Sequence, residues 1–180
     1  MRVIAGSLGG RRLKAPHGRL TRPTADRVKE ALFAMLGPIE GARVLDLYAG
    51  SGALGIEALS RGAARAVFVE RDARALRALK DNLAALGLAV AGAEVRRADA
   101  LAALAQAAER TERYELILID PPYLNAAELG GALSQMLPSL LAPGGRVVVE
   151  SDRREPLELA LPVVRARRYG DTSITIHHER

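Results

Sequence analysis

The chain has 180 residues, which is enough for one domain with a hydrophobic core and short for two. It contains no cysteine, which excludes disulfides and thiolate metal ligands, and the adjacent His177 and His178 would point to opposite faces of a strand. The net charge of +5 is concentrated in residues 1–30, which hold eight basic and two acidic side chains. We therefore expect no metal site, and a basic N-terminal extension (1–38) attached to a nearly neutral body (39–180).

The sequence also gives an expectation about membranes. The N-terminus lacks the apolar stretch of a signal peptide. The longest uncharged run, 129–145, contains two prolines and several polar residues, so it does not resemble a membrane span. We expect a cytoplasmic protein without a membrane partner.

The N-terminal extension is predicted to contain a hairpin and a helix. Two short extended pieces, 2–5 and 11–14, are joined by a glycine-rich turn, which is typical of a hairpin. An amphipathic helix follows Thr24, its expected N-cap, and Gly37-Pro38 ends it. The apolar stripe of this helix consists of Val28, Leu32, Met35 and Leu36.

From residue 43 onward, strand and helix patterns alternate. The expected strands are 43–48, 66–70, 94–97, 116–120, 146–150, 163–168 and 172–178, and the expected helices are 53–61, 72–86, 100–109 and 127–141. Gly170-Asp171 between the last two strands indicates a hairpin turn. The pattern predicts an α/β fold: a mostly parallel seven-stranded sheet with helices on both faces and an antiparallel C-terminal edge strand.

The loop after the first strand indicates a nucleotide-type cofactor. Gly50, Gly52 and Gly55 form a G-x-G-x-x-G motif, and Glu70 follows Gly50 by 20 residues, as in dinucleotide-binding proteins. Asp46 separates the possibilities, because a carboxylate about 4 Å from a pyrophosphate would repel it by roughly 4 kcal/mol at an effective dielectric near 20. The same carboxylate would attract the ammonium group of S-adenosylmethionine. Asp99, which ends the third strand, is a candidate acceptor for the adenine amine.

Asp120-Pro121-Pro122-Tyr123 follows the fourth strand and is the most specific motif of the chain. The two prolines fix an extended turn and leave only carbonyl acceptors. An exocyclic base amine attacks a methyl group poorly, because its lone pair is delocalised into the ring. The Asp120 carboxylate and the Pro121 carbonyl can accept from its two N–H groups and localise that lone pair. Tyr123 can stack on a flipped base, which is worth about 1–3 kcal/mol.

The motifs together resemble a known family. Residues 46–63 with Asp-Pro-Pro-Tyr are similar to class I methyltransferases, which have a Rossmann-like fold. Gly-Gly-Arg-Arg-Leu (9–13) and Arg-Pro-Thr-Ala-Asp-Arg-Val-Lys-Glu-Ala-Leu-Phe (22–33) narrow the resemblance to the bacterial 16S ribosomal RNA guanine-N2 methyltransferase family. The resemblance covers residues 2 to about 150, with a looser similarity at 165–176.

The resemblance implies transfer of a methyl group from S-adenosylmethionine to a guanine N2 amine in 16S ribosomal RNA, within an assembled small subunit as a further hypothesis. The expected catalytic residues are Asp120, Pro121, Pro122 and Tyr123. The expected cofactor-binding residues are Asp46, Tyr48, Ala49, Gly50, Ser51, Gly52, Gly55, Glu70, Arg71, Asp99 and Ala100, with Arg22 and Thr24 from the N-terminal extension. The expected RNA-binding residues are Arg11, Arg12, Lys14, Arg22 and Arg27.

Alternatives remain open from the sequence. An adenine-N6 DNA methyltransferase or a protein glutamine-N5 methyltransferase also uses a Pro-Pro-Tyr turn. However, glutamine enzymes generally start this motif with Asn, and DNA enzymes usually carry an inserted recognition region. A nicotinamide-dependent oxidoreductase is disfavoured because no mid-chain histidine offers an acid–base group. A non-catalytic RNA-binding protein with the same fold is the last alternative.

Overall fold

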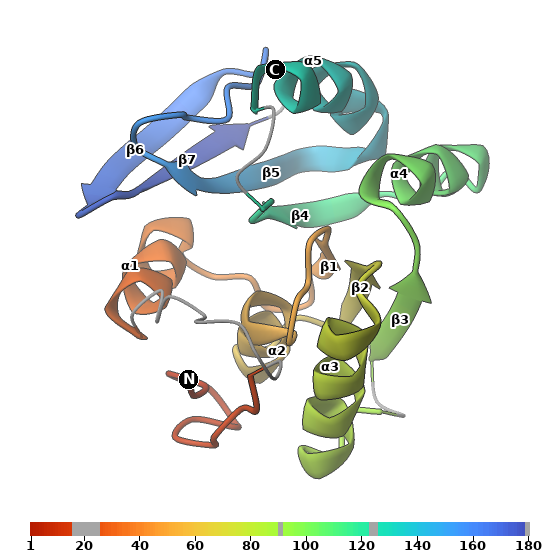
Figure 1. Ribbon diagram of the computed structural model, residues 1–180, viewed down its shortest axis with the longest axis vertical. Coiled ribbons are helices and arrows are strands. Elements are labelled where there is room, and N and C mark those ends of the chain that lie inside the picture. Colours follow the sequence, from red (N-terminus) through yellow and green to blue (C-terminus); the bar gives the residue numbers. More distant parts are fainter. Residues whose placement is uncertain (16–25, 90–91, 123–125, 179–180) are drawn as a thin grey trace.

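The computed structural model describes residues 1–15, 26–89, 92–122 and 126–178, which form a sheet covered by helices on both faces (Figure 1). The strands are β1 (Arg43–Asp46), β2 (Arg65–Glu70), β3 (Ala93–Arg97), β4 (Tyr114–Ile119), β5 (Leu141–Asp152), β6 (Val163–Tyr169) and β7 (Thr172–His178). The helices are α1 (Asp26–Leu36), α2 (Ala53–Ser60), α3 (Ala73–Ala85), α4 (Ala100–Glu109) and α5 (Ala126–Met136), followed by the short 3₁₀ helix η1 (Leu137–Leu140).

The sheet has the strand order β3-β2-β1-β4-β5-β7-β6. Strands β1 to β5 pair in parallel, and β7 pairs antiparallel with both β5 and β6. The mostly parallel seven-stranded sheet with an antiparallel C-terminal strand is therefore confirmed. The prediction that the C-terminal strand lies at the edge is wrong: the edge strand is β6, because the β6–β7 hairpin inserts β7 between β5 and β6.

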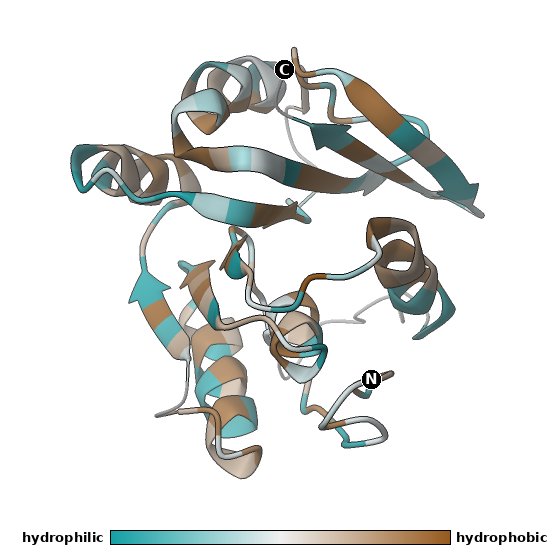
Figure 2. Cartoon of the chain, turned by 180° about the vertical axis from the view of Figure 1, so that it is seen from behind, coloured by the Kyte–Doolittle hydropathy of each residue, from teal (hydrophilic) through white to brown (hydrophobic). Residues whose placement is uncertain are grey.

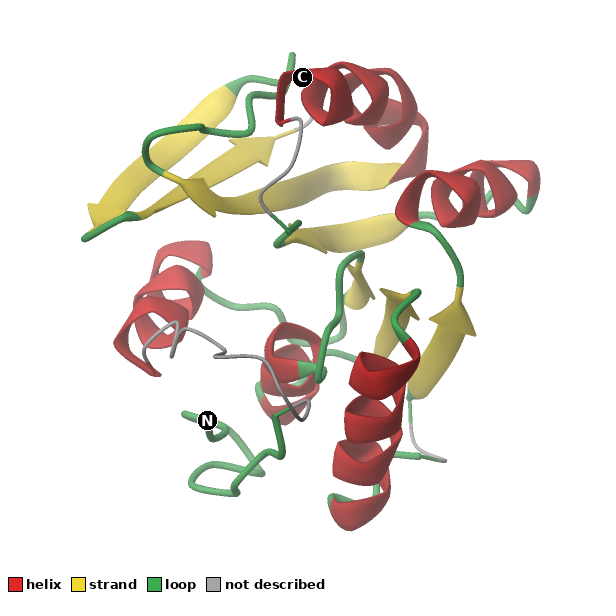
Figure 3. Cartoon of the chain, in the orientation of Figure 1, coloured by secondary structure: helices red, strands yellow, loops and turns green. Residues whose placement is uncertain are grey.

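Helices lie on both faces of the sheet (Figure 3), and a hydrophobic cluster lies on each face. One cluster lies between the sheet and α1, α2 and α3, and the other lies between the sheet and α4, α5 and η1. Strand β4 contributes to both clusters, and its last four residues, Leu116–Ile119, are each at most 1% exposed. Strands buried on both faces need apolar side chains in every position, which explains the unbroken apolar run in this segment. Figure 2 shows the same apolar colouring along the central strands.

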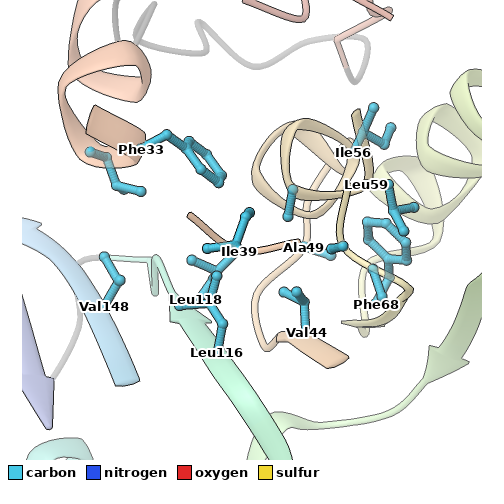
Figure 4. Packing of buried hydrophobic residues seen from close by; sticks show 14 of the residues in the cluster. Phe33, Ile39, Val44, Ala49, Ile56, Leu59, Phe68, Leu116, Leu118 and Val148 are labelled. Carbon is cyan, nitrogen blue, oxygen red and sulfur yellow. The ribbon is translucent and has the colours of Figure 1, made fainter. Parts of the chain in front are cut away.

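Helix α1 packs on the sheet through the apolar stripe that the sequence predicts. Phe33 of this helix belongs to the same hydrophobic cluster as Leu118 of β4 and Val148 of β5 (Figure 4). Val28, Leu32 and Leu36 are buried, whereas Met35 is half-buried. The helix ends at Leu36, and Gly37 follows with φ 71°, in the left-handed conformation that favours glycine after a helix.

The N-terminal segment folds back as the predicted hairpin, held by the antiparallel bridge between Arg2 and Arg12. Val3 and Leu13 are buried in the cluster under α1, α2 and α3. The hairpin therefore packs against the body as part of the same core.

The largest difference from the expected elements lies between residues 127 and 152. The single helix expected over 127–141 ends at Met136 and continues as η1, because Pro138 has no N–H to donate in an α-helix. Strand β5 begins earlier and ends later than the predicted 146–150.

Candidate active site

A cleft of about 680 Å³ opens at the carboxyl edge of the sheet. Its walls come from the ends of β1, β2, β4 and β5, the loop after β1, and the start of α3, with Lys29 of α1 and Met1 at one side. Ligands of open α/β sheets bind at this edge. The acidic lining residues are Asp46, Glu70, Asp72, Asp99, Asp120 and Glu150.

Strand register places the carboxylates of the cleft on one face of the sheet. Asp46 pairs with Leu118, which belongs to the cluster under α1, α2 and α3. Because side chains alternate along a strand, Asp120 points to the same face as Leu118, two residues earlier. Glu150 likewise follows Val148 of that cluster by two residues. The sheet therefore brings acids from different strands to the floor of one cleft.

Asp46 organises the loop after β1 (residues 47–52), which is called the cofactor loop here because the sequence predicts that it binds the cofactor. The Gly55 N–H at the start of α2 donates to Asp46 Oδ2 at 2.8 Å. A Cβ at position 55 would lie 2.3 Å from the ring of Phe68, so only glycine allows α2 to approach β2 this closely. Gly52 has φ 87°, which also favours glycine. The predicted loop residues from Tyr48 to Ser51 all line the cleft, whereas Gly52 and Gly55 act through this geometry.

Glu70 closes the other side of the loop. Its Oε2 accepts from the Gly50 N–H at 2.8 Å, and its Oε1 accepts from the N–H groups of Arg71 and Asp72, each at 2.8 Å. The sequence predicts Glu70 as an acceptor for ribose hydroxyls. In the structure the Glu70 carboxylate accepts hydrogen bonds from three backbone N–H groups, so it fixes the shape of the loop beside the cleft.

The rim beside Glu70 contains the other predicted cofactor residues. Arg71 Nη1 lies 3.3 Å from Asp99 Oδ2, and both side chains are more than half exposed, so this ion pair contributes little to stability. The Asp99 carboxylate also caps α4 by accepting from the Leu101 N–H at 3.0 Å. Burial, followed by the charge of Asp99, raises the pKa of Tyr48 to about 12. Ala100 lines the cleft at the start of α4.

The Asp120-Pro121-Pro122 turn forms the end of the cleft away from β2. All three residues line the cleft, and Pro121 is buried. Tyr123 lies outside the described residues. Of the predicted catalytic and cofactor-binding residues that the structure describes, all except Gly52 and Gly55 line this one cavity. Asp46 ends β1, and Asp120 follows the neighbouring strand β4.

Two of the carboxyl groups, those of Asp46 and Asp120, hold protons more tightly than in water. Burial raises the pKa of Asp46 from 3.8 to about 7; the Gly55 N–H opposes this shift and the charge of Glu70 adds to it. Burial also raises the pKa of Asp120 well above its ordinary value, with further contributions from Glu150 and Asp46. Strongly shifted pKa values in a cleft are typical of functional sites.

Sequence reasoning missed three charged residues of the cleft, which are Lys29, Asp72 and Glu150. Glu150 is only 3% exposed and follows the apolar run of β5, just as Asp120 follows the apolar run of β4. This repeated pattern of an acid after an apolar strand was a signal from which Glu150 could have been predicted. Lys29 gave no such signal, since it lies within an amphipathic helix. Its Nζ lies 3.4 Å from Glu57 Oε2 and donates to the Arg2 carbonyl at 2.5 Å, and burial lowers its pKa.

The basic N-terminal segment lies against the cofactor loop. Asn82 of α3 donates to the carbonyls of Lys14 and Ser51, and its Oδ1 accepts from the Lys14 N–H at 2.8 Å. Of the predicted RNA-binding residues, Arg11, Arg12, Lys14 and Arg27 are exposed. Arg22 and Thr24 lie outside the described residues.

Within the described ranges, no group of three or more His, Asp or Glu side chains is arranged to hold a metal ion. No helix in the described part of the chain is long and apolar enough to cross a membrane.

Comparison with known proteins agrees with this geometry. The model of the family described as "Conserved hypothetical protein 95" matches residues 1–178. YlbH of Bacillus subtilis, provisionally named an rRNA methyltransferase, is 45% identical over 185 residues, with 100% of both chains covered. Ribosomal RNA small subunit methyltransferase D of Escherichia coli K12 is 38% identical over 172 residues, which are 92% of this chain and 80% of that one.

A solved structure adds to the comparison. The 16S rRNA N2 G1207 methyltransferase of Thermus thermophilus, in complex with AdoMet and guanosine, superposes with a TM-score of 0.70 at 26% identity, covering 91% of this chain and 44% of that one. The chain therefore belongs to the "Conserved hypothetical protein 95" family and has the fold of class I methyltransferases.

Proposed function

We propose that the protein transfers a methyl group from S-adenosylmethionine to the exocyclic N2 amine of a guanine in 16S ribosomal RNA. Its family and fold make it an S-adenosylmethionine-dependent rRNA methyltransferase. The observation that carries the finer proposal is the half-buried Asp120 carboxylate beside Pro121 and Pro122, in the same cleft as Asp46. The guanine N2 target is also that named for the Thermus thermophilus neighbour.

The cleft fits S-adenosylmethionine in volume and in charge. About 680 Å³ lies within the range of small-molecule and cofactor sites. The buried Asp46 carboxylate suits an ammonium group, and Tyr48, Arg71 and Asp99 line the wall toward the β2–β3 side. When bound, S-adenosylmethionine supplies an electrophilic methyl group.

Asp120 and the proline turn activate the acceptor amine. The Asp120 carboxylate accepts one N–H of the exocyclic amine, and the Pro121 carbonyl accepts the other, which localises the nitrogen lone pair toward the methyl group. Forming the N–C bond would break the bond between the methyl carbon and the sulfur of S-adenosylmethionine, with the electron pair returning to sulfur, and would leave a surplus proton on nitrogen. The raised pKa of Asp120 makes its carboxylate a suitable acceptor for that proton, from which it passes to water.

The N-terminal extension, residues 1–38, is proposed to contact the RNA through Arg11, Arg12, Lys14 and Arg27. Removing both Arg11 and Arg12 should lower the slope of log affinity against log salt by about two units. An unchanged slope would remove these two residues from the RNA interface.

Transfer of a labelled methyl group tests the reaction directly. The substrates are naked 16S RNA, assembled small subunits and DNA, each digested to nucleosides after the reaction. N2-methylguanosine from 16S RNA is the expected product, and N6-methyladenine would move the target to adenine. Equal methylation of naked RNA and assembled subunits would argue against the proposal that the assembled subunit is the preferred substrate.

Asp120→Asn should lower the rate of transfer by about 10² to 10⁴-fold, the usual contribution of a general base. Binding of S-adenosylmethionine should change little. Glu155→Gln is a matched control, because Glu155 is exposed and lies in a small separate hollow behind Pro121 and Pro122. Full activity of the Asp120→Asn variant would exclude the proposed role of this carboxylate.

A further inference from the structure

Arg167 of β6 lies in line with the end of the cleft that Asp120 and Glu150 form. Asp120 and Glu150 lie side by side, because the preceding residues, Ile119 and Val149, are register partners of β4 and β5. Glu150 pairs with Ile174 on β7, and Ile174 pairs with Arg167 on β6. Asp120, Glu150, Ile174 and Arg167 therefore form one row across four neighbouring strands.

Arg167 also points to the face of the sheet on which the cleft opens. Ile174 belongs to the cluster under α1, α2 and α3, and its register partner Arg167 lies on the same face. Asp120 and Glu150 share that face. Three strand spacings of about 4.8 Å place the backbone of Arg167 about 14 Å from that of Asp120.

The surroundings of Arg167 leave its charge available. All residues from Val163 to Arg168 are exposed, and no ion pair joins Arg167 to another residue of the described ranges. Its neighbour Arg165 donates to the Met35 carbonyl at the end of α1 at 3.0 Å. Arg153 donates its backbone N–H to the Asp171 carbonyl in the β6–β7 turn, so a further exposed arginine lies beside the turn that follows β6.

We propose that Arg167, supported by Arg153 beside the β6–β7 turn, binds a phosphate of the substrate RNA close to the nucleotide that enters the cleft. Arginine pairs with phosphate through two parallel hydrogen bonds. The N-terminal segment lies on the other side of α1 from β6 (Figure 1). The RNA strand would thus be held on both sides of the cleft. The inference rests on the proposed function only in requiring that RNA is the substrate.

A competing role for these arginines is protection of the sheet edge. Charged side chains on an exposed edge strand prevent pairing with the edge of another molecule. That role predicts that loss of Arg167 promotes self-association and leaves RNA affinity unchanged. The two roles therefore differ in what they predict for RNA binding.

Arg168 provides a matched control on the same strand. It is equally exposed but pairs with Ser173, so it points to the opposite face of the sheet. Binding of a 16S RNA fragment would be measured against salt concentration for the wild type and the variants Arg167→Ala, Arg167→Lys and Arg168→Ala. Binding of S-adenosylmethionine would be measured in parallel as a check on folding.

Arg167→Ala should lower the slope of log affinity against log salt by about one unit. Arg167→Lys should keep most of the slope, since it keeps the charge, and Arg168→Ala should behave as the wild type. Equal losses in the two alanine variants, or no loss in Arg167→Ala, would overturn the inference. A wild-type protein that methylates no rRNA would instead refute the proposed function, so the two failures are distinguishable.

Discussion

Replacing Asp46 by Asn should stabilise the cofactor-free protein at neutral and alkaline pH. Burial raises the pKa of this carboxyl from 3.8 to about 7, so the folded state binds a proton that the unfolded state has already released. A carboxyl group whose pKa is raised by folding does not lower the free energy of unfolding below about pH 4, because it is protonated in both states. Its cost then grows as pH rises toward 7 and stays constant above that.

The magnitude follows from the size of the shift. Each pKa unit corresponds to 1.36 kcal/mol, so about three units correspond to at most about 4 kcal/mol at pH 7 and above. An asparagine at this position keeps an oxygen that can accept from the Gly55 N–H and carries no charge. The variant should therefore gain stability relative to the wild type as pH rises from 4 to 7.

Urea unfolding of both proteins without cofactor, at intervals between pH 4.5 and 8, measures this difference. Asp171→Asn is the control, because Asp171 is exposed in the β6–β7 turn and its replacement should leave the pH profile of the wild type unchanged. A difference between Asp46→Asn and the wild type that is independent of pH would refute the reasoning.

The same substitution should weaken binding of S-adenosylmethionine, because the proposed partner of the ammonium group loses its charge. Titration calorimetry should show a wild-type affinity that improves as pH rises through 7, and an affinity of Asp46→Asn without that improvement. Equal pH profiles would place the ammonium group elsewhere in the cleft.

Three further substitutions test the packing around the cleft. Gly55→Ala should cost about 1–3 kcal/mol and weaken cofactor binding, because the new Cβ would lie 2.3 Å from the ring of Phe68. Glu57→Gln should cost about 3–5 kcal/mol in urea unfolding, since it leaves Lys29 buried without its counter-charge. Asn82→Ala should cost about 1–3 kcal/mol, because it removes the side chain that joins the N-terminal segment to the cofactor loop.

Each of these has a control in the chain. Gly131→Ala adds a Cβ that meets open space, and it should be neutral or slightly stabilising within α5. Glu109→Gln and Lys80→Ala change exposed helix positions and should alter stability by less than about 0.5 kcal/mol. Losses as large in the controls as in the test variants would contradict the packing argument.

The alternation of strands and helices could be predicted from the sequence because it depends on local periodicity. Apolar runs, turn glycines and the Asp-Pro-Pro turn each depend on a few neighbouring residues, and the structure reproduces nearly all the expected elements. Gly37 and Gly55 show why the glycines are informative: one adopts a conformation that favours glycine, and the other allows a close approach between α2 and Phe68. The acids at the ends of the first four strands, Asp46, Glu70, Asp99 and Asp120, also followed from the sequence, because carboxyl ends of parallel strands share one edge of a sheet.

Tertiary structure alone decided which of these groups meet and how they are charged. Glu150 becomes a neighbour of Asp120 only because β5 lies next to β4, and strand order is not a local property. The raised pKa values of Asp46 and Asp120 depend on burial and on charges from other strands. The near-neutral composition of the body concealed the exposed arginines of β6, because a sum over residues does not record which face or edge carries them. The sequence by itself determined the elements and their chemistry, whereas the electrostatics of the cleft and the alignment of Arg167 with Asp120 required the register of the sheet.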